Sequence, residues 1–203
     1  MKIFIVGCAK TGTWLLTRLF HAFDDFIFVD CAEERSLSDL IECFPPPGRH
    51  VVMKRRWDEI FSCFDAFGKH EEKREAVRTH GIKLVYTHRS REDVMASMLK
   101  AALKDAKPED KEVITEAHNA RYDACIQQAE QYGELLTVRV DFARLTSEPD
   151  VVQQEVASAL GLKIKHLWSE YPAFVPNEGV AHSGLGENYS LRPIGAGYGG
   201  DER

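Results

Sequence analysis

Two features are missing from this 203-residue chain, and each absence removes a class of protein from consideration. Its apolar runs fall well short of the roughly 20 residues that a membrane-spanning helix requires. Positive charge is not in surplus, because 26 Lys and Arg stand against 32 Asp and Glu, and the net charge is −6. Broad nucleic-acid binding is therefore not expected. With 44% hydrophobic and 29% charged residues, the composition is that of a soluble globular protein.

Paired cysteines and clustered metal ligands are also missing. The five cysteines are odd in number, widely spaced and without a C-x-x-C pair, which argues against a disulfide framework or a zinc site. Neither an H-E-x-x-H motif nor a set of carboxylates at ligand spacing occurs, so we expect no metal. Only four consecutive apolar residues, 3–6, precede Gly7, which is too few for a secretory signal peptide. The cytoplasm is the expected location.

The length predicts one domain over residues 1–203, since domains commonly contain about 100–200 residues. No internal repeat or linker divides the chain. The last segment, 188–203, is rich in glycine and poor in core-forming residues, so it is either mobile or ordered by a ligand.

Apolar runs rich in β-branched and aromatic residues alternate with helical patterns along the chain. The runs are nearly continuous, which is typical of strands buried on both faces, and they fall at 3–6, 26–29, 51–53, 82–86 and 135–140. Helices are expected at 13–23, 36–43, 58–70, 91–104, 109–132 and 149–160. In the helix 109–132 we expect close packing of a small-residue face formed by Val113, Ala117, Ala120 and Ala124. Strand followed by helix, repeated, predicts an α/β fold with a parallel sheet.

A glycine-flanked loop joins the first expected strand to the first helix, from Gly7 to Gly12. Backbone N–H groups and the positive end of the helix converge there, an arrangement that binds phosphate or sulfate. Lys10 adds a positive charge, and the hydroxyls of Thr11 and Thr13 can donate to oxyanion oxygens. The alternative is a tight turn in which glycine serves backbone geometry alone.

This loop departs from the triphosphate-binding pattern G-x-x-x-x-G-K-[ST]. Gly7 and Gly12 fit the pattern, but Thr13 occupies the lysine position and the lysine lies inside the loop, at Lys10.

A second set of polar residues follows the strand expected at 82–86. Arg89 falls at the end of that strand, and Ser97 lies in the second turn of the next helix. Both are expected to face the carboxyl edge of the sheet, where parallel α/β proteins bind ligands. The alternative is that Arg89 and Arg91 form surface ion pairs with Glu92 or Asp93, which is the more natural interpretation for Arg91.

Together these residues resemble the sulfotransferase superfamily, which uses 3′-phosphoadenosine 5′-phosphosulfate as donor. The run from Lys10 to Thr13 is similar to the family loop P-K-S/T-G-T-T, and Arg89 and Ser97 match the element R-x-P-x-D-x-x-x-S. The segment that begins at Phe142 is similar to Y-E-D-L-x-x-D/E-P…L-G. The matches appear in family order. The resemblance implies a three-layer sandwich with a central parallel sheet, akin to the P-loop nucleotide kinases.

The resemblance also implies which residues hold the donor and its product, adenosine 3′,5′-bisphosphate. The 5′-phosphosulfate loop would comprise Lys10, Thr11, Gly12, Thr13 and Trp14. Arg89 and Ser97 would bind the 3′-phosphate, and the Phe142 ring would pack on adenine. The family's C-terminal phosphate clamp is not evident, and Arg192 in the glycine-rich tail would take its place. Trp14 replaces the second loop threonine of the family, which removes one hydroxyl contact.

For the acceptor's proton, the resemblance implies a base in the segment after the second strand. Glu34 matches the glutamate that acts as the base in protein-tyrosine sulfotransferases. The alternative is that Glu33 and Glu34 are two solvated surface carboxylates without a catalytic role. After the third strand, Lys54 or Arg55 would contact the sulfuryl group, or else belong to a surface basic cluster.

The implied reaction is in-line sulfuryl transfer, catalysed by Lys10, Glu34 and Lys54, to a hydroxyl or amine of a small-molecule, glycan or peptide acceptor. A P-loop small-molecule kinase is a competing interpretation, and a catalytically inactive nucleotide-binding scaffold is another.

Overall fold

The computed structural model describes residues 1–28, 37–56, 70–104 and 106–170. Its centre is a five-stranded sheet in the order β2-β3-β1-β4-β5. The strands are β1 (Lys2–Gly7), β2 (Phe26–Phe28), β3 (His50–Arg56), β4 (Ile82–His88) and β5 (Leu136–Asp141). Every neighbouring pair is parallel, so the predicted α/β fold with a parallel sheet is confirmed.

The strand register brings the carboxyl ends of the central strands level with one another. Gly7, the last residue of β1, lies opposite Arg56 of β3 and Thr87 of β4. The loop after β1 and the segment after β4 therefore leave the sheet side by side. These are the two segments that carry the predicted anion-binding residues.

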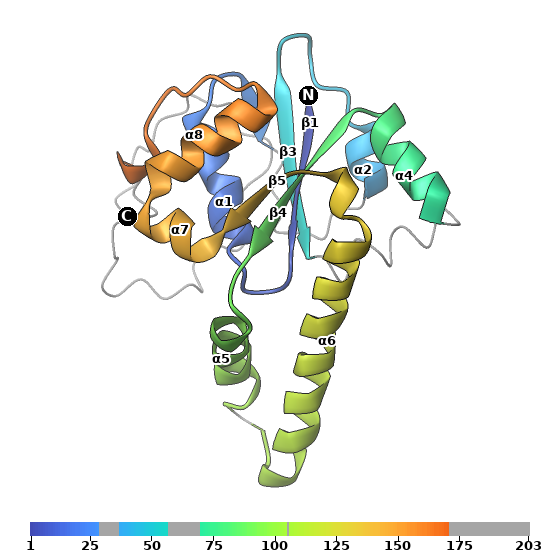
Figure 1. The fold of residues 1–203 in the computed structure, drawn as a ribbon, viewed down its shortest axis with the longest axis vertical. Coiled ribbons are helices and arrows are strands. Elements are labelled where there is room, and N and C mark those ends of the chain that lie inside the picture. Colours follow the sequence, from blue (N-terminus) through green and yellow to red (C-terminus); the bar gives the residue numbers. More distant parts are fainter. Residues whose placement is uncertain (29–36, 57–69, 105, 171–203) are drawn as a thin grey trace, which may run out of the picture.

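Helices cover both faces of the sheet, which gives the predicted three layers (Figure 1). One face is covered by α1 (Thr13–Leu19), α7 (Phe142–Ser147) and α8 (Pro149–Leu160). The other is covered by α2 (Leu37–Glu42), α4 (His70–Thr79) and α6 (Lys111–Gln131). Side chains of β1 alternate between the two cores: Ile5 packs with α1 and α8, and Phe4 packs with α4 and α6. Burial on both faces explains why the strand sequence is continuously apolar.

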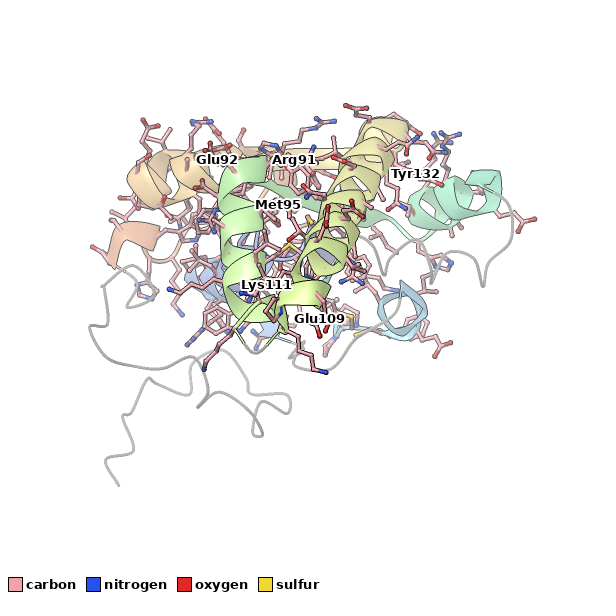
Figure 2. All side chains as sticks on the ribbon, turned by 90° about the horizontal axis from the view of Figure 1, so that it is seen from below. Arg91, Glu92, Met95, Glu109, Lys111 and Tyr132 are labelled. Atoms are coloured by element: carbon pink, nitrogen blue, oxygen red, sulfur yellow. The ribbon has the colours of Figure 1, made fainter. Side chains whose placement is uncertain are left out.

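Two helices extend beyond the carboxyl edge of the sheet as a hairpin. They are α5 (Arg91–Ala102) and α6, which is preceded by a 3₁₀ turn at Pro108–Asp110 (Figure 1). Seen along the strands from that edge, the two helices lie side by side (Figure 2).

The small-residue face predicted on the long helix is exposed instead of packed. Val113 is 66% exposed, and the three alanines on that face are also exposed. The helix instead buries Tyr122, Cys125 and Ala129 against the sheet. The prediction was wrong because a stripe of small residues does not say which face meets the sheet, and the first half of α6 extends beyond the sheet (Figure 1).

The last described segment is fastened to the core by Trp168, in a 3₁₀ turn at Trp168–Glu170. The indole is fully buried, and its Nε1 donates to the Leu19 carbonyl at 2.9 Å. The fully buried Gln153 side chain accepts from the Trp168 backbone N–H at 3.0 Å and donates to the His166 carbonyl at 2.8 Å. These bonds tie the chain after α8 to α8 itself and to α1.

Two helices, α4 and α7, lie where no helix was predicted. The helix expected at 58–70 falls, except for His70, outside the described residues, as does the tail 188–203. None of the helices in the described part of the chain combines the length and apolar character needed to cross a membrane.

Candidate functional site

The loop between β1 and α1 has two residues with left-handed backbone. Lys10 has φ 67° and Gly12 has φ 92°. The helix then begins at Thr13, and the first bond of its ladder runs from the Leu16 N–H to the Gly12 carbonyl at 2.9 Å. The N–H groups of a first helical turn have no acceptor within their own helix, so they remain available to an anion. The Lys10 side chain is exposed at this point.

Gly12 is required for space as well as for its backbone angle. A Cβ atom on Gly12 would lie 2.3 Å from Cδ2 of Phe142, the first residue of α7. The Phe142 ring thus packs directly on the start of α1. This contact joins the end of β5 to the loop after β1.

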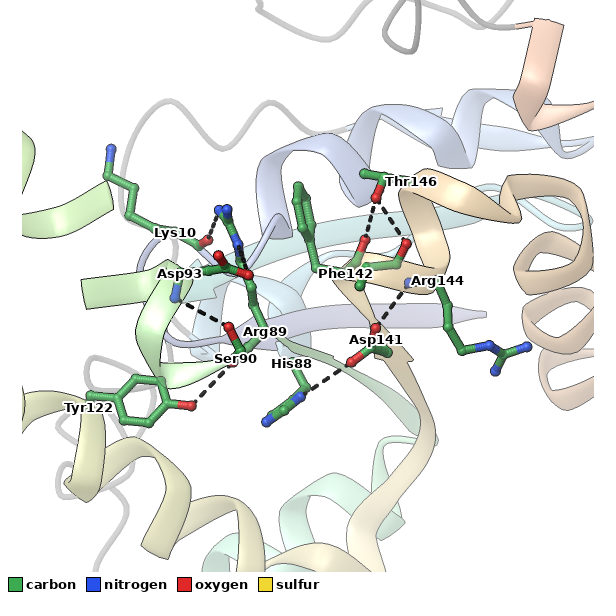
Figure 3. Close-up of polar contacts among 11 residues, drawn as sticks. Lys10, His88, Arg89, Ser90, Asp93, Tyr122, Asp141, Phe142, Arg144 and Thr146 are labelled. Carbon is green, nitrogen blue, oxygen red and sulfur yellow. Dashed lines mark hydrogen bonds and ion pairs between the residues drawn. The ribbon is translucent and has the colours of Figure 1, made fainter. Parts of the chain in front are cut away.

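The Arg89 side chain joins three of the segments at this edge (Figure 3). Its Nη1 donates to the Lys10 carbonyl at 3.3 Å, and its Cζ lies 4.7 Å from the centroid of the Phe142 ring. Its Nε lies 3.7 Å from Oδ2 of Asp93. That Nε is buried and has no hydrogen-bond partner among the described residues. A guanidinium carries five N–H donors, so Arg89 keeps the capacity to donate to an incoming phosphate from its other nitrogens.

The backbone that carries Arg89 is fixed by two further hydrogen bonds. Ser90 caps α5, since its hydroxyl accepts from the Asp93 N–H at 3.2 Å. The Tyr122 hydroxyl, on α6, donates to the Arg89 carbonyl at 3.2 Å. Ser97 lies in α5 one turn after Asp93 and is half-buried.

Arg91 forms a surface ion pair, with a partner that the sequence did not suggest. Its guanidinium contacts both carboxylate oxygens of Asp123 on α6, at 2.7 and 3.2 Å. It therefore fastens α5 to α6, and the guanidinium aimed at the loop is that of Arg89.

The Thr11 hydroxyl is turned into the protein, whereas the sequence interpretation gave it to a bound oxyanion. Thr11 is only 2% exposed, and its hydroxyl donates to the Cys8 carbonyl at 2.7 Å. It also lies 2.8 Å from the hydroxyl of Thr87. The sequence did not predict this contact with Thr87, because the register between two strands cannot be read from the sequence.

Trp14 and Lys54 come from different elements, α1 and β3. Trp14 is 39% exposed, and the Arg18 guanidinium stacks on its ring at 4.7 Å. Lys54 is half-buried near the carboxyl end of β3, opposite Ile5 of β1. Since alternate strand residues share a face, Lys54 lies on the same side of the sheet as Val52, which packs in the core with α1.

His88 and His50 have different surroundings. His88 Nδ1 lies 3.6 Å from Oδ2 of Asp141, the residue that caps α7. The Arg144 N–H donates to Asp141 at 3.0 Å, and this bond is the largest of the effects that lower the pKa of that carboxyl. His50 is the first residue of β3, so it lies at the amino edge, away from the loop. Burial, and next the charge of the Met1 amine, lower the pKa of His50.

Several predicted site residues lie outside the described part of the chain. Glu34, its neighbour Glu33 and Arg192 are among them, and only the backbone of Arg55 is described. Within the described residues, the structure brings together Lys10, Gly12, Thr13, Arg89 and Phe142. No cluster of three or more His, Cys, Asp or Glu side chains in that part of the chain is suited to a metal ion.

An open cavity of about 470 Å³ lies elsewhere, along the end of α8. It is lined by Gln154, Ala157, Ser158, Gly161, Leu162 and Ile164. Ile164 bridges to Phe23, which precedes β2, so the cavity is at the amino edge of the sheet. Charge and backbone donors, which are what an anion needs, gather at the opposite edge, and we place the candidate site there.

Comparison with known proteins supports the fold assignment. No family model and no curated protein matches the sequence. Among solved structures, the crystal structure of mouse sulfotransferase SULT7A1 complexed with PAP is similar, with a TM-score of 0.55 and 13% sequence identity. The chain has a sulfotransferase-like fold. The similarity covers 81% of this chain and 60% of the mouse protein, so the chain spans less than two thirds of that protein's length.

Proposed function

We propose that this protein is a sulfotransferase that uses 3′-phosphoadenosine 5′-phosphosulfate as donor. The observation that carries the proposal is the meeting of two cationic elements, in which Arg89 donates to the Lys10 carbonyl at 3.3 Å. A donor with phosphate at both its 3′ and 5′ positions requires two anion sites, whereas a nucleoside triphosphate uses one continuous loop. Two separate sites at one sheet edge match the first kind of nucleotide.

The proposed donor site uses backbone and side chains from three strand–helix junctions. The N–H groups at the start of α1, with Lys10 and Thr13, hold the 5′-phosphosulfate. Arg89 holds the 3′-phosphate, with Ser97 on the following helix as its second donor. Phe142 bounds the nucleotide and also holds the Arg89 guanidinium against the loop. Trp14 offers an exposed ring beside the loop for base stacking.

In the proposed reaction, the acceptor oxygen forms a bond to sulfur while the bond from sulfur to the 5′-phosphate oxygen breaks. Lys10 donates to the departing oxygen and stabilises the charge that develops on it, a contribution of about 3 kcal/mol for a well-placed donor. Lys54 holds the sulfuryl oxygens. Glu34 accepts the proton of the acceptor hydroxyl. The acceptor is a small molecule, glycan or peptide that presents such a group.

Thermal-shift titration tests the donor class. We expect adenosine 3′,5′-bisphosphate to raise the melting temperature, since a ligand at 100 times its Kd stabilises the folded state by about 2.7 kcal/mol. ATP with magnesium is expected to have little effect. Stabilisation by ATP with magnesium alone would instead identify a kinase. Binding of the bisphosphate without sulfate transfer to any member of a panel of alcohols, phenols and amino sugars would identify an inactive scaffold.

A further inference from the structure

Two buried threonine hydroxyls meet beneath the Lys10 loop. Thr11 and Thr87 are 2% and 1% exposed, and their Oγ1 atoms are 2.8 Å apart. Each hydroxyl has one proton to donate. Thr11 donates its proton to the Cys8 carbonyl at 2.7 Å. Thr87 therefore shares its own proton between the Thr11 hydroxyl oxygen at 2.8 Å and the Val6 carbonyl at 3.3 Å.

Gly7 makes room for this pair. A Cβ atom on Gly7 would lie 2.2 Å from Thr87 Oγ1 and 2.6 Å from Thr11 Oγ1. Gly7 is not among the glycines with a left-handed backbone, unlike Gly12. The structure therefore needs glycine at position 7 for space, and that space is filled by the two hydroxyls.

The threonine pair connects the two cationic elements of the site. Thr11 directly follows Lys10, and Thr87 lies two residues before Arg89. The pair is thus a buried tie between the loop after β1 and the end of β4. It lies below the exposed contact from Arg89 to the Lys10 carbonyl. Lys10 has a left-handed backbone, a conformation that costs a non-glycine residue free energy and has to be held by its surroundings.

We propose that Thr11 and Thr87 are positioning residues that set the Lys10 loop relative to Arg89. The proposal rests on the proposed function for its catalytic consequence, but not for the tie itself. Neither hydroxyl touches the donor in this account. Their role is to hold the loop in the shape in which its N–H groups and Lys10 face the same ligand as Arg89. A small displacement of such groups is costly, with about 100-fold lost for a shift of roughly 1 Å.

The Thr87→Val variant removes the donated proton while keeping the shape of the side chain. Thr87→Ser keeps the hydroxyl and serves as the conservative rescue. Thr17→Val is the matched control, because Thr17 is also 2% exposed and its hydroxyl donates at 2.6 Å, but to Thr13 within the same helix. The control loses one hydroxyl hydrogen bond without separating the loop from β4.

Hydrogen exchange of the loop amides in the ligand-free protein tests the tie without reference to function. We expect the amides of residues 7–13 to exchange about tenfold faster in Thr87→Val, which corresponds to the loss of one hydrogen bond. The Ser variant and the Thr17→Val control are expected to exchange as the wild type does. Equal exchange in Thr87→Val and Thr17→Val would overturn the proposal.

A double-mutant cycle that combines Thr11→Val with Thr87→Val, read out by the same amide exchange, tests the pair without relying on either single variant. If the hydroxyls act as a pair, the double variant exchanges no faster than the faster single variant, within about twofold. If the rate increases of the two single variants multiply in the double variant, the two residues act independently and the proposed pairing is wrong. Titration with adenosine 3′,5′-bisphosphate separates the two proposals. If the wild type does not bind the bisphosphate, the proposed function is wrong but the threonine tie is not affected. If the wild type binds it and Thr87→Val binds it with the same Kd, the positioning role alone is wrong.

Discussion

The guanidinium of Arg89 lies against the ring of Phe142, with its Cζ atom 4.7 Å from the ring centroid. The same guanidinium donates to the Lys10 carbonyl at 3.3 Å. Arg89 follows β4, Lys10 follows β1 and Phe142 follows β5, so one side chain contacts the segments that leave three strands of the sheet. An anion that binds beside the Arg89 guanidinium therefore lies close to all three segments.

Replacing Arg89 should weaken donor binding selectively. A hydrogen bond to a charged group contributes about 1.5–3 kcal/mol, so we expect Arg89→Ala to raise the Kd for adenosine 3′,5′-bisphosphate by roughly 10- to 100-fold. Affinity for adenosine 5′-phosphate, which lacks the 3′-phosphate, should change much less. Arg91→Ala is the matched control, since Arg91 pairs with Asp123 at the surface. Calorimetric titration measures both, and an equal loss in the two variants would contradict the assignment.

Replacing Lys10 should reduce turnover more than binding. We expect Lys10→Ala to lower the rate of sulfate transfer about 100- to 1000-fold, because the charge on the departing oxygen loses its main donor. The Kd of the bisphosphate should change far less. Lys83 at the start of β4 is exposed at the opposite edge, so Lys83→Ala removes the same charge without touching the site. Transfer of radiolabelled sulfate to the best acceptor of the panel supplies the rates.

Replacing Gly12 should destabilise the protein more than replacing another glycine that also has a left-handed backbone. Gly12→Ala meets both a left-handed backbone and the Phe142 ring, so we expect a loss of about 2–5 kcal/mol in the free energy of unfolding. Gly48 has φ 77° and open space around it, and Gly48→Ala should cost only about 1–2 kcal/mol. Urea unfolding of both variants measures the difference. Equal losses would show that Phe142 does not press on the loop.

Much of the fold was readable from the sequence because burial on both sheet faces leaves a continuous apolar signature. All five predicted strands are present at nearly the predicted residues. The helix α4 was missed because its sequence, HEEKREAVRT, has few apolar residues, and α7 because it is only one to two turns long. The orientation of α6 was predicted wrongly from small residues, because the first half of that helix extends beyond the sheet.

The residues of the candidate site were predictable by type, but their contacts were not. The sequence predicted Lys10 because it lies in the loop after one strand, and Arg89 because it lies at the end of another. That Thr11 turns inward depends on Thr87 lying opposite Gly7 in the β1–β4 register, which arises only when the sheet forms. The same holds for Arg89 and Phe142, which are 53 residues apart in the sequence.

Replacing Trp14 and Trp168 one at a time should separate an effect on stability from an effect on donor binding. Trp168 is fully buried, so Trp168→Ala should lower the free energy of unfolding by about 3–5 kcal/mol. Trp14 is 39% exposed and stacks with Arg18, so Trp14→Ala should lower the free energy of unfolding by only about 1 kcal/mol while weakening bisphosphate binding by about 1–3 kcal/mol. Unfolding curves and titrations of both variants test this. An unchanged Kd in Trp14→Ala would remove Trp14 from the donor site.

Mild acid should destabilise the protein in part through His21. Burial, and next the charge of Arg18, lower the pKa of His21 in the folded state. The unfolded chain then takes up a proton at about pH 6.5, before the folded protein does. His21 therefore contributes its full stability above that pH and loses it as the pH falls toward the lower, folded value. We expect His21→Gln to flatten the dependence of unfolding free energy on pH in this range, and an unchanged slope would count against it.

A crystal structure with bound adenosine 3′,5′-bisphosphate would show whether Lys10 and Arg89 hold the two phosphates of the donor. We expect the 5′-phosphate on the loop between Gly7 and Thr13, beside Lys10, and the 3′-phosphate on Arg89. A bisphosphate bound elsewhere, such as in the cavity along α8, or seated at this edge without contact to Arg89, would contradict this placement.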